Sequence, residues 1–363
     1  MKTIVYYNPY IEVDVTVLKY LSRYYHIIWF PVIYNNGCDI YTEEELHKYA
    51  ADYGIEIHIV SISWRRRSFR QFMTEYKLIR YIKAINPDLI FTCNRDLYYT
   101  ILAFFFLPKK IVLLGIHDYK LHSNFETNVF LRFSYWLSFH IYDNFLLYSK
   151  NQYDMFLKNY SYKNCFQTYL AAKNYGDASL KKQISYGKIR FLFFGRIDYY
   201  KGLDLLINAC ERLVEKGKSN FELSICGIGD YWKTCEPLIS YKSIYNLQIR
   251  FIDYKEIPDL FSTHHYLVLP YRDATQSGPS MIAVNYGLPI IATNLASFKD
   301  VYSDDAAIFY DAGELESALE RALEMPETDY LYMKNAAEKI KEKYSEESVS
   351  DKYRKVIDSL LNN

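Results

Sequence analysis

Residues 189–204, IRFLFFGRIDYYKGLD, decide the fold class of this chain. The apolar run Ile189–Phe194 leads into a turn that carries one glycine and two cations, and an amphipathic pattern begins after Gly202. An apolar run, a polar turn and an amphipathic run in this order form the repeating unit of an α/β protein with a parallel sheet. We therefore expect a strand, a turn and a helix here.

The same alternation continues on both sides of this segment. Towards the C-terminus it predicts strands at residues 189–194, 222–226, 248–252, 266–269 and 289–292, and helices at 203–216, 231–240, 257–262 and 279–286. In the first half it predicts strands at 3–7, 26–32, 55–62, 89–93, 111–116 and 144–148, and helices at 15–25, 43–53, 69–85 and 98–106. Residues 314–361 follow an almost wholly helical pattern. Two parallel α/β sheets in series are expected, each with a crevice at the carboxyl ends of its strands.

The length of 363 residues exceeds what one ordinary core needs and suits two domains. The strand and helix pattern loosens at AAKNYGDAS, residues 171–179, as expected of a linker. We predict a Rossmann-like domain at 1–170, a linker at 171–188, a second Rossmann-like domain at 189–340, and a C-terminal helix at 341–363 that packs back on the first domain.

Composition excludes several classes of protein. The chain has 43 Lys+Arg and 43 Asp+Glu, so no overall positive charge favours nucleic acid. Its six cysteines form no C-x-x-C pair, which argues against zinc and disulfides and fits a reducing cytosol. The longest apolar stretch, residues 98–116, is interrupted by Pro108 and the two lysines that follow it. Each of the two remaining apolar parts is too short to cross a bilayer. Met1 leads straight into a strand pattern, so we expect a cytoplasmic protein without a signal peptide.

The turn after Phe194 has the chemistry of an anion site. Gly195 allows the backbone to approach a ligand closely, and Arg196 and Lys201 supply positive charge at the carboxyl edge of the strand. Such a turn suits a diphosphate whose charge must be stabilised as it leaves. A plain strand-to-helix turn with solvated charges would have the same pattern.

A second segment, TQSGPSMIA at residues 275–283, has the pattern of a capped helix start. Pro279 fits the first helical position, and Ser277 or Gly278 would be the N-cap. The amide groups and the dipole at such a helix start favour an anion. An ordinary buried helix would begin in the same way.

These two segments, in this order, resemble the retaining family 4 glycosyltransferases, whose GT-B fold has two Rossmann-like domains with parallel sheets facing across a cleft. The resemblance covers nearly the whole chain and is strongest from residue 189 to 322. Three further segments match family motifs: Gly227-Ile228-Gly229 after the next strand, Asp253-Tyr254 in the base-contacting loop, and the strand PIIATN at 289–294.

The resemblance implies transfer of a sugar, with retention of configuration, from a nucleotide-sugar donor to a glycan or lipid-linked acceptor in the synthesis of a surface polysaccharide or glycolipid. It assigns catalytic roles to Arg196 and Lys201 on the donor diphosphate, and to His117, which follows the strand at 111–116 and would face the donor sugar. A histidine at a strand end can equally be structural. The implied donor-binding residues are Gly195, Gly227, Asp253, Tyr254, Gln276, Ser277 and Gly278. No Asp-x-Asp motif follows a suitable strand, so neither a metal nor a separate cofactor is expected.

The chain departs from the family pattern at two places. Aligned on Gly287-x-Pro289, the positions of the two family glutamates are occupied by Ala274 and Ile282, which makes this a Gln-Ser-Gly variant of the segment. The glycine-rich loop after the first strand is also missing, since residues 8–14 read NPYIEVD. These departures leave two alternatives: a catalytically inactive GT-B binding or partner subunit, and a GT-B enzyme of another class such as a nucleotide-sugar epimerase.

A basic aromatic segment runs from Trp64 to Phe72 and continues through Lys77, Arg80 and Lys83. Cations interleaved with aromatic residues favour docking on an anionic membrane surface. The alternative is a solvated helix face whose aromatic residues pack inward.

Overall fold

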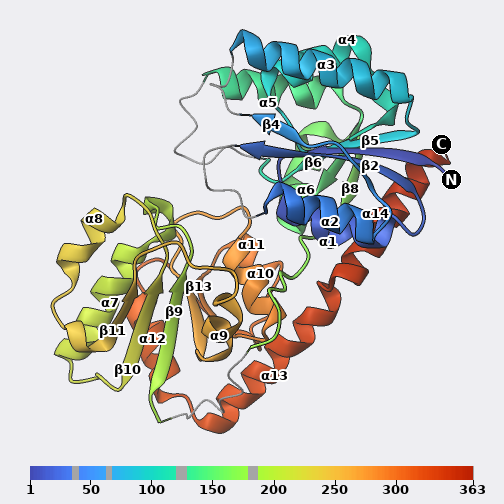
Figure 1. Cartoon of the computed structure of the whole chain (residues 1–363). Coiled ribbons are helices and arrows are strands. Elements are labelled where there is room, and N and C mark those ends of the chain that lie inside the picture. Colours follow the sequence, from blue (N-terminus) through green and yellow to red (C-terminus); the bar gives the residue numbers. More distant parts are fainter. Residues whose placement is uncertain (35–40, 63–67, 120–128, 179–186, 363) are drawn as a thin grey trace. The chain divides into compact units, whose positions relative to one another are not determined.

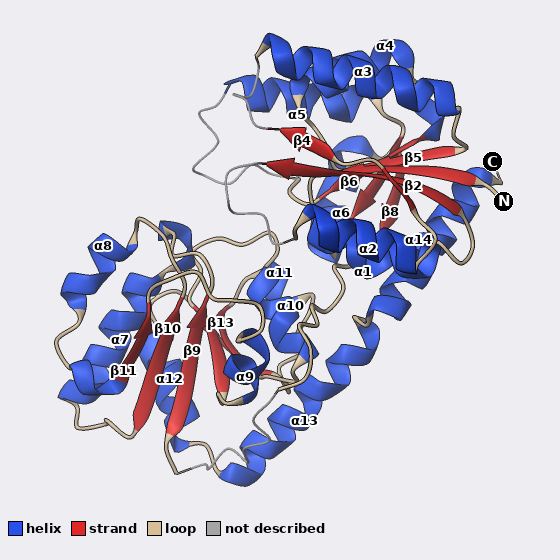
Figure 2. Cartoon of the chain, viewed as in Figure 1, coloured by secondary structure: helices blue, strands red, loops and turns tan. Residues whose placement is uncertain are grey.

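The structure is a computed structural model that describes residues 1–34, 41–62, 68–119, 129–178 and 187–362 (Figures 1 and 2). The chain divides into two compact units. The first unit comprises Met1–Ala171 together with Glu346–Asn363, and the second unit comprises Ala172–Ser345.

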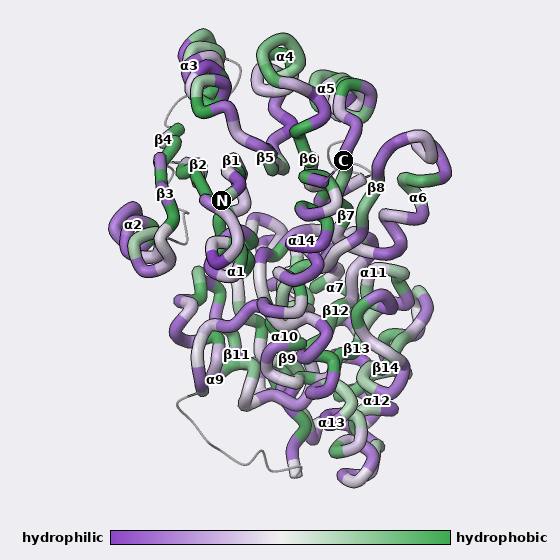
Figure 3. The backbone as a smooth tube through the Cα atoms, turned by 90° about the vertical axis from the view of Figure 1, so that its right-hand side faces the viewer, coloured by the Kyte–Doolittle hydropathy of each residue, from purple (hydrophilic) through white to green (hydrophobic). Residues whose placement is uncertain are grey.

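The first unit is built on a parallel sheet with the strand order β3-β2-β1-β5-β6-β7-β8, and β4 also pairs with β2. Its strands are β1 (Thr3–Asn8), β2 (His26–Tyr34), β3 (Glu56–Ile57), β4 (Val60–Ile62), β5 (Leu89–Thr92), β6 (Val112–Ile116), β7 (Asn144–Leu147) and β8 (Asn164–Gln167). Most of the central strands are buried along their whole length, so they read as continuous apolar runs, the green stretches of Figure 3.

Helices cover both faces of this sheet. One face carries α1 (Ile11–Leu21), α2 (Glu43–Asp52) and α14 (Glu346–Leu361), whose buried residues share one core cluster. The other face carries α3 (Phe69–Ile85), α4 (Leu97–Phe106), α5 (Val129–Ile141) and α6 (Lys150–Tyr160), which share a second cluster. A short 3₁₀ turn, η1 (Lys109–Ile111), follows α4.

The last helix of the chain belongs to the first unit. α14 packs along α1 and buries Tyr353 and Ile357 in the core that α1 and α2 share. Tyr25 Oη donates a hydrogen bond to Asp358 at 2.6 Å, and Lys19 forms an ion pair with Glu346. The first unit is therefore assembled from two segments that are far apart in the sequence.

The second unit has a six-stranded parallel sheet with the order β11-β10-β9-β12-β13-β14. Its strands are β9 (Ile189–Phe194), β10 (Phe221–Cys226), β11 (Tyr245–Gln248), β12 (Tyr266–Leu269), β13 (Ile290–Thr293) and β14 (Ala307–Tyr310). Its helices are α7 (Leu203–Glu215), α8 (Trp232–Cys235), α9 (Ile257–Ser262), α10 (Gly278–Asn285), α11 (Ala296–Lys299), α12 (Leu315–Glu324) and α13 (Glu327–Lys343), with 3₁₀ turns η3 (Tyr199–Lys201), η4 (Glu236–Leu238) and η5 (Lys242–Ile244).

Several predicted elements differ from the structure. The strand predicted at 248–252 is wrong, because β11 ends at Gln248 and the Arg250 N–H closes a turn onto the Gln248 carbonyl. The helix predicted at 231–240 is reduced to α8 and η4, since Pro237 lacks the N–H that a longer helix needs. Five helices and strands, α5, α6, β8, α11 and β14, were not predicted at all. Within the described ranges no helix is long and apolar enough to span a bilayer.

Candidate functional site

The turn after β9 lies directly on the loop after β10. The Gly195 N–H donates to the Cys226 carbonyl and the Ile197 N–H to the Ile228 carbonyl, each at 2.9 Å. A Cβ placed on Gly227 would lie 1.9 Å from the Gly195 oxygen, and one on Gly229 would lie 2.1 Å from the Ile197 oxygen. Both positions therefore require glycine for packing alone, whatever further contact Gly227 makes to a ligand.

Lys201 is buried beside this turn. Lys201 is only 6% exposed, and this burial lowers the pKa of its ammonium group. The Nζ atom lies 5.5 Å from the centre of the Tyr271 ring and 3.1 Å from the position that a Cβ on Gly195 would occupy. Among the residues that the structure describes, no carboxylate forms an ion pair with Lys201. A buried ammonium without a counter-charge is costly and is well placed to receive an anion.

The start of α10 meets the same turn. Ser277 is the N-cap, and its Oγ accepts a hydrogen bond from the Ser280 N–H at 3.3 Å. Pro279 Cγ lies 3.4 Å from the Cβ position of Gly195, so Gly195 separates Lys201 from the first turn of α10. The two segments that the sequence singled out, 80 residues apart, therefore converge at Gly195.

Only one backbone donor at this helix start remains for a ligand. Pro279 has no N–H, and the N–H of Ser280 is used by the cap, which leaves the N–H of Gly278 without a partner among the described residues. A second cation approaches the same point, since Lys173 Nζ lies 3.9 Å from the Cβ position of Gly278. The sequence had placed Lys173 in the linker, where nothing marked it as a site residue.

Arg196 lies on the turn but points differently from Lys201. Its side chain is 72% exposed, and its Nε donates to Asp198 at 2.6 Å. The structure thus gives Arg196 an acidic neighbour on its own turn, and its predicted contact with a diphosphate stays a prediction.

Arg272 ties the two segments together, and sequence reasoning missed it. Its two terminal nitrogens donate to both oxygens of Asp204 at 2.9 and 2.6 Å, and its N–H donates to the Tyr200 carbonyl at 2.7 Å. Its guanidinium also lies 4.2 Å from the centre of the Tyr199 ring. The loop that leads to α10 is therefore braced against the turn that holds Lys201. No local pattern signals this pairing, because the partners are 68 residues apart.

The remaining predicted donor residues lie at the carboxyl edge of the same sheet. Asp253 and Tyr254 are in the loop between β11 and α9, where Asp253 is exposed and accepts a hydrogen bond from the Lys255 N–H at 2.9 Å. Gln276 precedes the α10 cap, and its buried Nε2 makes no hydrogen bond within the described residues. Ile282 is buried in α10 and Ala274 is half-buried, so neither position offers a carboxylate.

His117, the predicted catalytic residue of the first unit, follows β6 directly and is surrounded by aromatic rings. Its ring stacks on Tyr148 at a centroid distance of 4.3 Å and lies 4.1 Å from the ring of Tyr10. Its carbonyl accepts a hydrogen bond from Gln152 at 2.9 Å. The ring is 8% exposed, and its assigned role stays a prediction.

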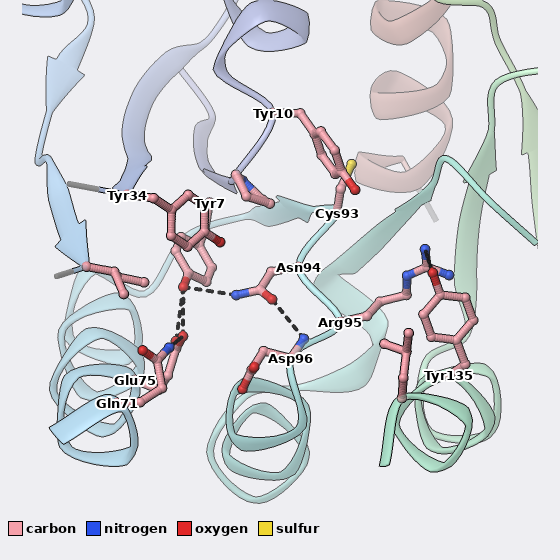
Figure 4. Close-up of a pocket in the computed structure, with 13 residues that line it drawn as sticks. Tyr7, Tyr10, Tyr34, Gln71, Glu75, Cys93, Asn94, Arg95, Asp96 and Tyr135 are labelled. Atoms are coloured by element: carbon pink, nitrogen blue, oxygen red, sulfur yellow. Dashed lines mark hydrogen bonds between the residues drawn. The ribbon is translucent and has the colours of Figure 1, made fainter. Parts of the chain in front are cut away.

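A pocket of about 290 Å³ lies at the carboxyl ends of β1 and β5 in the first unit (Figure 4). It is enclosed by the loops after these strands and by helices α3 and α5. Phenol, amide, carboxyl and guanidinium groups line it, a mixture that suits a hydroxyl-rich ligand. The lining includes Tyr7, Tyr10, Tyr34, Gln71, Glu75, Asn94, Arg95, Asp96 and Tyr135.

Glu75 is the buried acid of this pocket, which we call the Glu75 pocket. Tyr7 donates to both of its oxygens at 3.0 and 3.1 Å, and Gln71 donates to one of them at 2.8 Å (Figure 4). Burial raises the pKa of Glu75 to about 8, although these hydrogen bonds act in the opposite direction. The site therefore holds a carboxyl that is largely protonated at neutral pH. Sequence reasoning did not single out Glu75, because it is simply the one acidic residue of a basic helix.

The comparison with protein families matches only a part of the second unit. Residues 188–325 match the model of the family "Glycosyl transferases group 1". An uncharacterized 41.2 kDa protein in the cps region of Klebsiella pneumoniae is 31% identical over 124 residues, which are 34% of this chain and 33% of that protein. Glycogen synthase of Thermus thermophilus is 31% identical over 118 residues, 32% of this chain and 26% of that enzyme. The chain thus matches a third or less of the length of these relatives.

Solved structures resemble the whole chain at low identity. HepE of Anabaena in complex with UDP-glucose has a TM-score of 0.73 at 13% identity and covers 99% of this chain and 100% of its own. Sucrose-phosphate synthase of Thermosynechococcus elongatus has a TM-score of 0.75 at 14% identity with complete coverage of both chains. Trehalose-phosphate synthase of Burkholderia vietnamiensis has a TM-score of 0.73 at 11% identity, covering 99% of this chain and 100% of its own. The predicted GT-B fold, with two parallel-sheet domains and C-terminal helices, is confirmed.

Proposed function

We propose that the protein is a glycosyltransferase that takes a sugar from a nucleotide-sugar donor bound to its second unit. The observation that carries the proposal is the buried ammonium of Lys201, which has no carboxylate partner in the described chain and lies beside Gly195 at the start of α10. The match of residues 188–325 to a glycosyltransferase family covers the same elements. Two of the similar structures are complexes with UDP-glucose and UDP, which supports a nucleotide diphosphate as the anion.

The proposed chemistry is electrostatic. As the bond between the sugar and the diphosphate breaks, negative charge grows on the departing oxygen. Lys201 and the Gly278 N–H stabilise that charge from fixed positions, without reorganisation during the reaction. Arg272 acts as a positioning residue, because it holds together the two segments that carry these groups. Transfer with retention of configuration follows from the family resemblance, and His117 is proposed to face the donor sugar.

We propose that the acceptor is a glycan or a lipid-linked sugar in surface polysaccharide or glycolipid synthesis. The relative in the Klebsiella cps region supports this class, and the Glu75 pocket offers polar groups for sugar hydroxyls. We place the protein in the cytoplasm, peripheral on the inner face of the cell membrane. The predicted membrane segment Trp64–Phe72 lies partly outside the described residues. Its contribution is tested by changing Arg65, Arg66, Arg67 and Arg70 to Ala, which is expected to weaken binding to anionic vesicles.

The experiment that tests the enzyme is a panel of nucleotide sugars, scored for thermal shift and for hydrolysis or transfer. A donor that binds only the folded protein raises the melting temperature by mass action. The Lys201→Ala variant is expected to lose the activity. Lys242→Ala, which removes an exposed lysine of another 3₁₀ turn, is the matched control and is expected to retain it. Equal activity of Lys201→Ala and the control would refute the proposed role.

The alternative is an inactive GT-B partner subunit, favoured by Ala274 and Ile282 at the positions of the family glutamates. It predicts that nucleotides shift the melting temperature while no donor is hydrolysed or transferred, with or without acceptor. An epimerase would instead release an altered nucleotide sugar without an acceptor. Analysis of the products distinguishes all three.

A further inference from the structure

Helix α5 of the first unit buries two serines and exposes two aromatic residues, although Phe139 and Ile141 of the same helix lie in the core. Ser134 and Ser138 are buried, and their hydroxyls donate to the carbonyls of Arg95 and Tyr135. Phe133 and Trp136, in contrast, are 47% and 52% exposed. A helix of a soluble domain normally places its aromatic residues against the core and its serines outside. The outer face of α5 is therefore built for an apolar environment.

Helix α4 continues this surface. α4 packs beside α5 and contains no charged residue (Figures 1 and 2). Its Phe105 is 71% exposed, and Phe104 is exposed next to it. Val129, Phe133 and Trp136 recur at spacings of four and three, which places them on one side of α5. We call five of the exposed apolar residues of the two helices the α4–α5 ridge: Phe104, Phe105, Val129, Phe133 and Trp136.

The elements around the ridge carry exposed basic residues and no exposed acidic residue. The elements α3, α4, η1 and α5 contain a single acidic residue, Glu75, and it is buried. Lys109 lies with its Nζ 4.6 Å from the centre of the Phe104 ring, so one cation lies directly against the ridge. The exposed cations of these four elements are Arg70, Lys77, Arg80, Lys83, Lys109, Lys110 and Arg132.

We propose that the α4–α5 ridge docks on an anionic lipid bilayer, with its aromatic side chains in the interfacial layer and the cations on lipid headgroups. Phenylalanine and tryptophan on an apolar face, with lysine and arginine along its border, is the composition of a helix that lies in a membrane surface. An anionic bilayer accommodates both the apolar residues and the cation Lys109 that lies against them. A second copy of this chain would bring the same cations against one another.

The docking surface also bears on the acceptor, and this step rests on the proposed function. Leu131 and Tyr135 of α5 line the Glu75 pocket, while Phe133 and Trp136 of the same helix belong to the ridge. One helix thus forms both a wall of the pocket and the proposed contact with lipid. An acceptor anchored in the bilayer by an apolar tail is the substrate class that this arrangement fits.

The test is sedimentation of the full chain with vesicles of phosphatidylcholine, with and without phosphatidylglycerol. We expect binding to the anionic vesicles only, weakened by salt. Phe105→Ser/Phe133→Ser/Trp136→Ser is expected to bind at least tenfold more weakly, because three aromatic side chains no longer leave water for the interfacial layer. Leu331→Ser/Tyr332→Ser, which removes similarly exposed apolar residues from α13 of the second unit, is expected to bind normally.

Further variants separate the possible outcomes. Phe133→Leu/Trp136→Leu keeps the ridge apolar and should retain binding, whereas Lys109→Glu/Lys110→Glu/Arg132→Glu should lose it. The proposal is overturned if the wild type ignores anionic vesicles or if the serine triple variant binds as well as the α13 control. It is also overturned if light scattering finds that the wild type is a dimer and the serine triple variant a monomer, since the ridge would then be a subunit interface. None of these readouts requires catalysis, so a failed donor assay leaves the docking result intact.

Discussion

Burial governs the behaviour of Lys201 in two opposite ways. The low exposure of its ammonium lowers its pKa and costs stability in the free protein, and the same burial would strengthen its attraction for the proposed diphosphate. Stability and ligand binding therefore compete at this one side chain, as is common at functional sites.

Replacement of Lys201 by methionine should separate the two effects. We expect Lys201→Met to melt at a higher temperature than the wild type without ligand, because an uncompensated buried charge is removed. The shift produced by UDP should largely disappear, and kcat/KM should fall roughly 100-fold or more, as when one stabilising donor is removed. Thermal unfolding with and without UDP measures both. A wild-type response to UDP in this variant would contradict the assignment.

Glu75 provides a pH signature for the pocket of the first unit. Its pKa is about 8 in the folded protein, against an ordinary value of 4.5. Between these values the folded protein binds a proton that the unfolded chain has lost, so this group makes stability fall as the pH rises from about 5 to 8.

The Glu75→Gln variant removes this titration and keeps the shape of the side chain. We expect its stability relative to the wild type to increase steadily over that pH range. The difference between the two proteins is the quantity to measure, by denaturant unfolding at several pH values, because Asp14 is also buried with a pKa of about 8 and its contribution cancels. A difference that does not change with pH would show that Glu75 is ionised in the folded state.

At the scale of elements, the contact between the Lys201 turn and α10 depends on the bidentate pair of Arg272 with Asp204. Lysine carries the same charge but cannot form this two-pronged contact. We expect Arg272→Lys to lower kcat/KM roughly 10- to 100-fold through a small displacement of the site, with little change in melting temperature. Arg212→Lys, which alters the arginine pair with Glu316 between α7 and α12, is the control and should leave the kinetics unchanged.

Some elements could be predicted from the sequence because local pattern and burial agree in them. α3 and β9 match their predicted bounds, and α10 differs from its prediction by one residue at each end. α5 was missed because its exposed phenylalanines and buried serines contradict the rule that periodicity reasoning uses. The strand predicted at 248–252 begins three residues and ends four residues after β11, because Tyr245–Gln248 is largely polar and the following residues look more like a strand.

The residues of the candidate site also divide into those with a clear local sequence pattern and those without one. Lys201, Ser277 and Gly278 could be found because each sits in a motif with its own local chemistry. Arg272 and Lys173 could not, since their importance arises from partners more than 60 residues away. Glu75 of α3 is a similar case: Tyr7 lies on β1 and Asn94 lies in the loop after β5, and only the folded unit brings the three together.

At the scale of the molecule, the first unit should depend on the last helix of the chain. Deleting residues 346–363 would expose the core that Val349, Tyr353 and Ile357 cover on α1. We expect the truncated chain to lose the folding of its first unit, seen as rapid proteolysis within residues 1–171, while the second unit stays resistant. Equal resistance of both units would show that α14 is dispensable.

This return of the chain has a consequence for biosynthesis. The ribosome synthesises residues 1–171 of the first unit before the second unit, but α14, which covers one face of the first sheet, is translated only after the whole of the second unit. Domains usually finish folding in the order in which they emerge. The nascent first unit therefore exposes the apolar residues of α1 that α14 covers in the folded protein until the second unit has been synthesised.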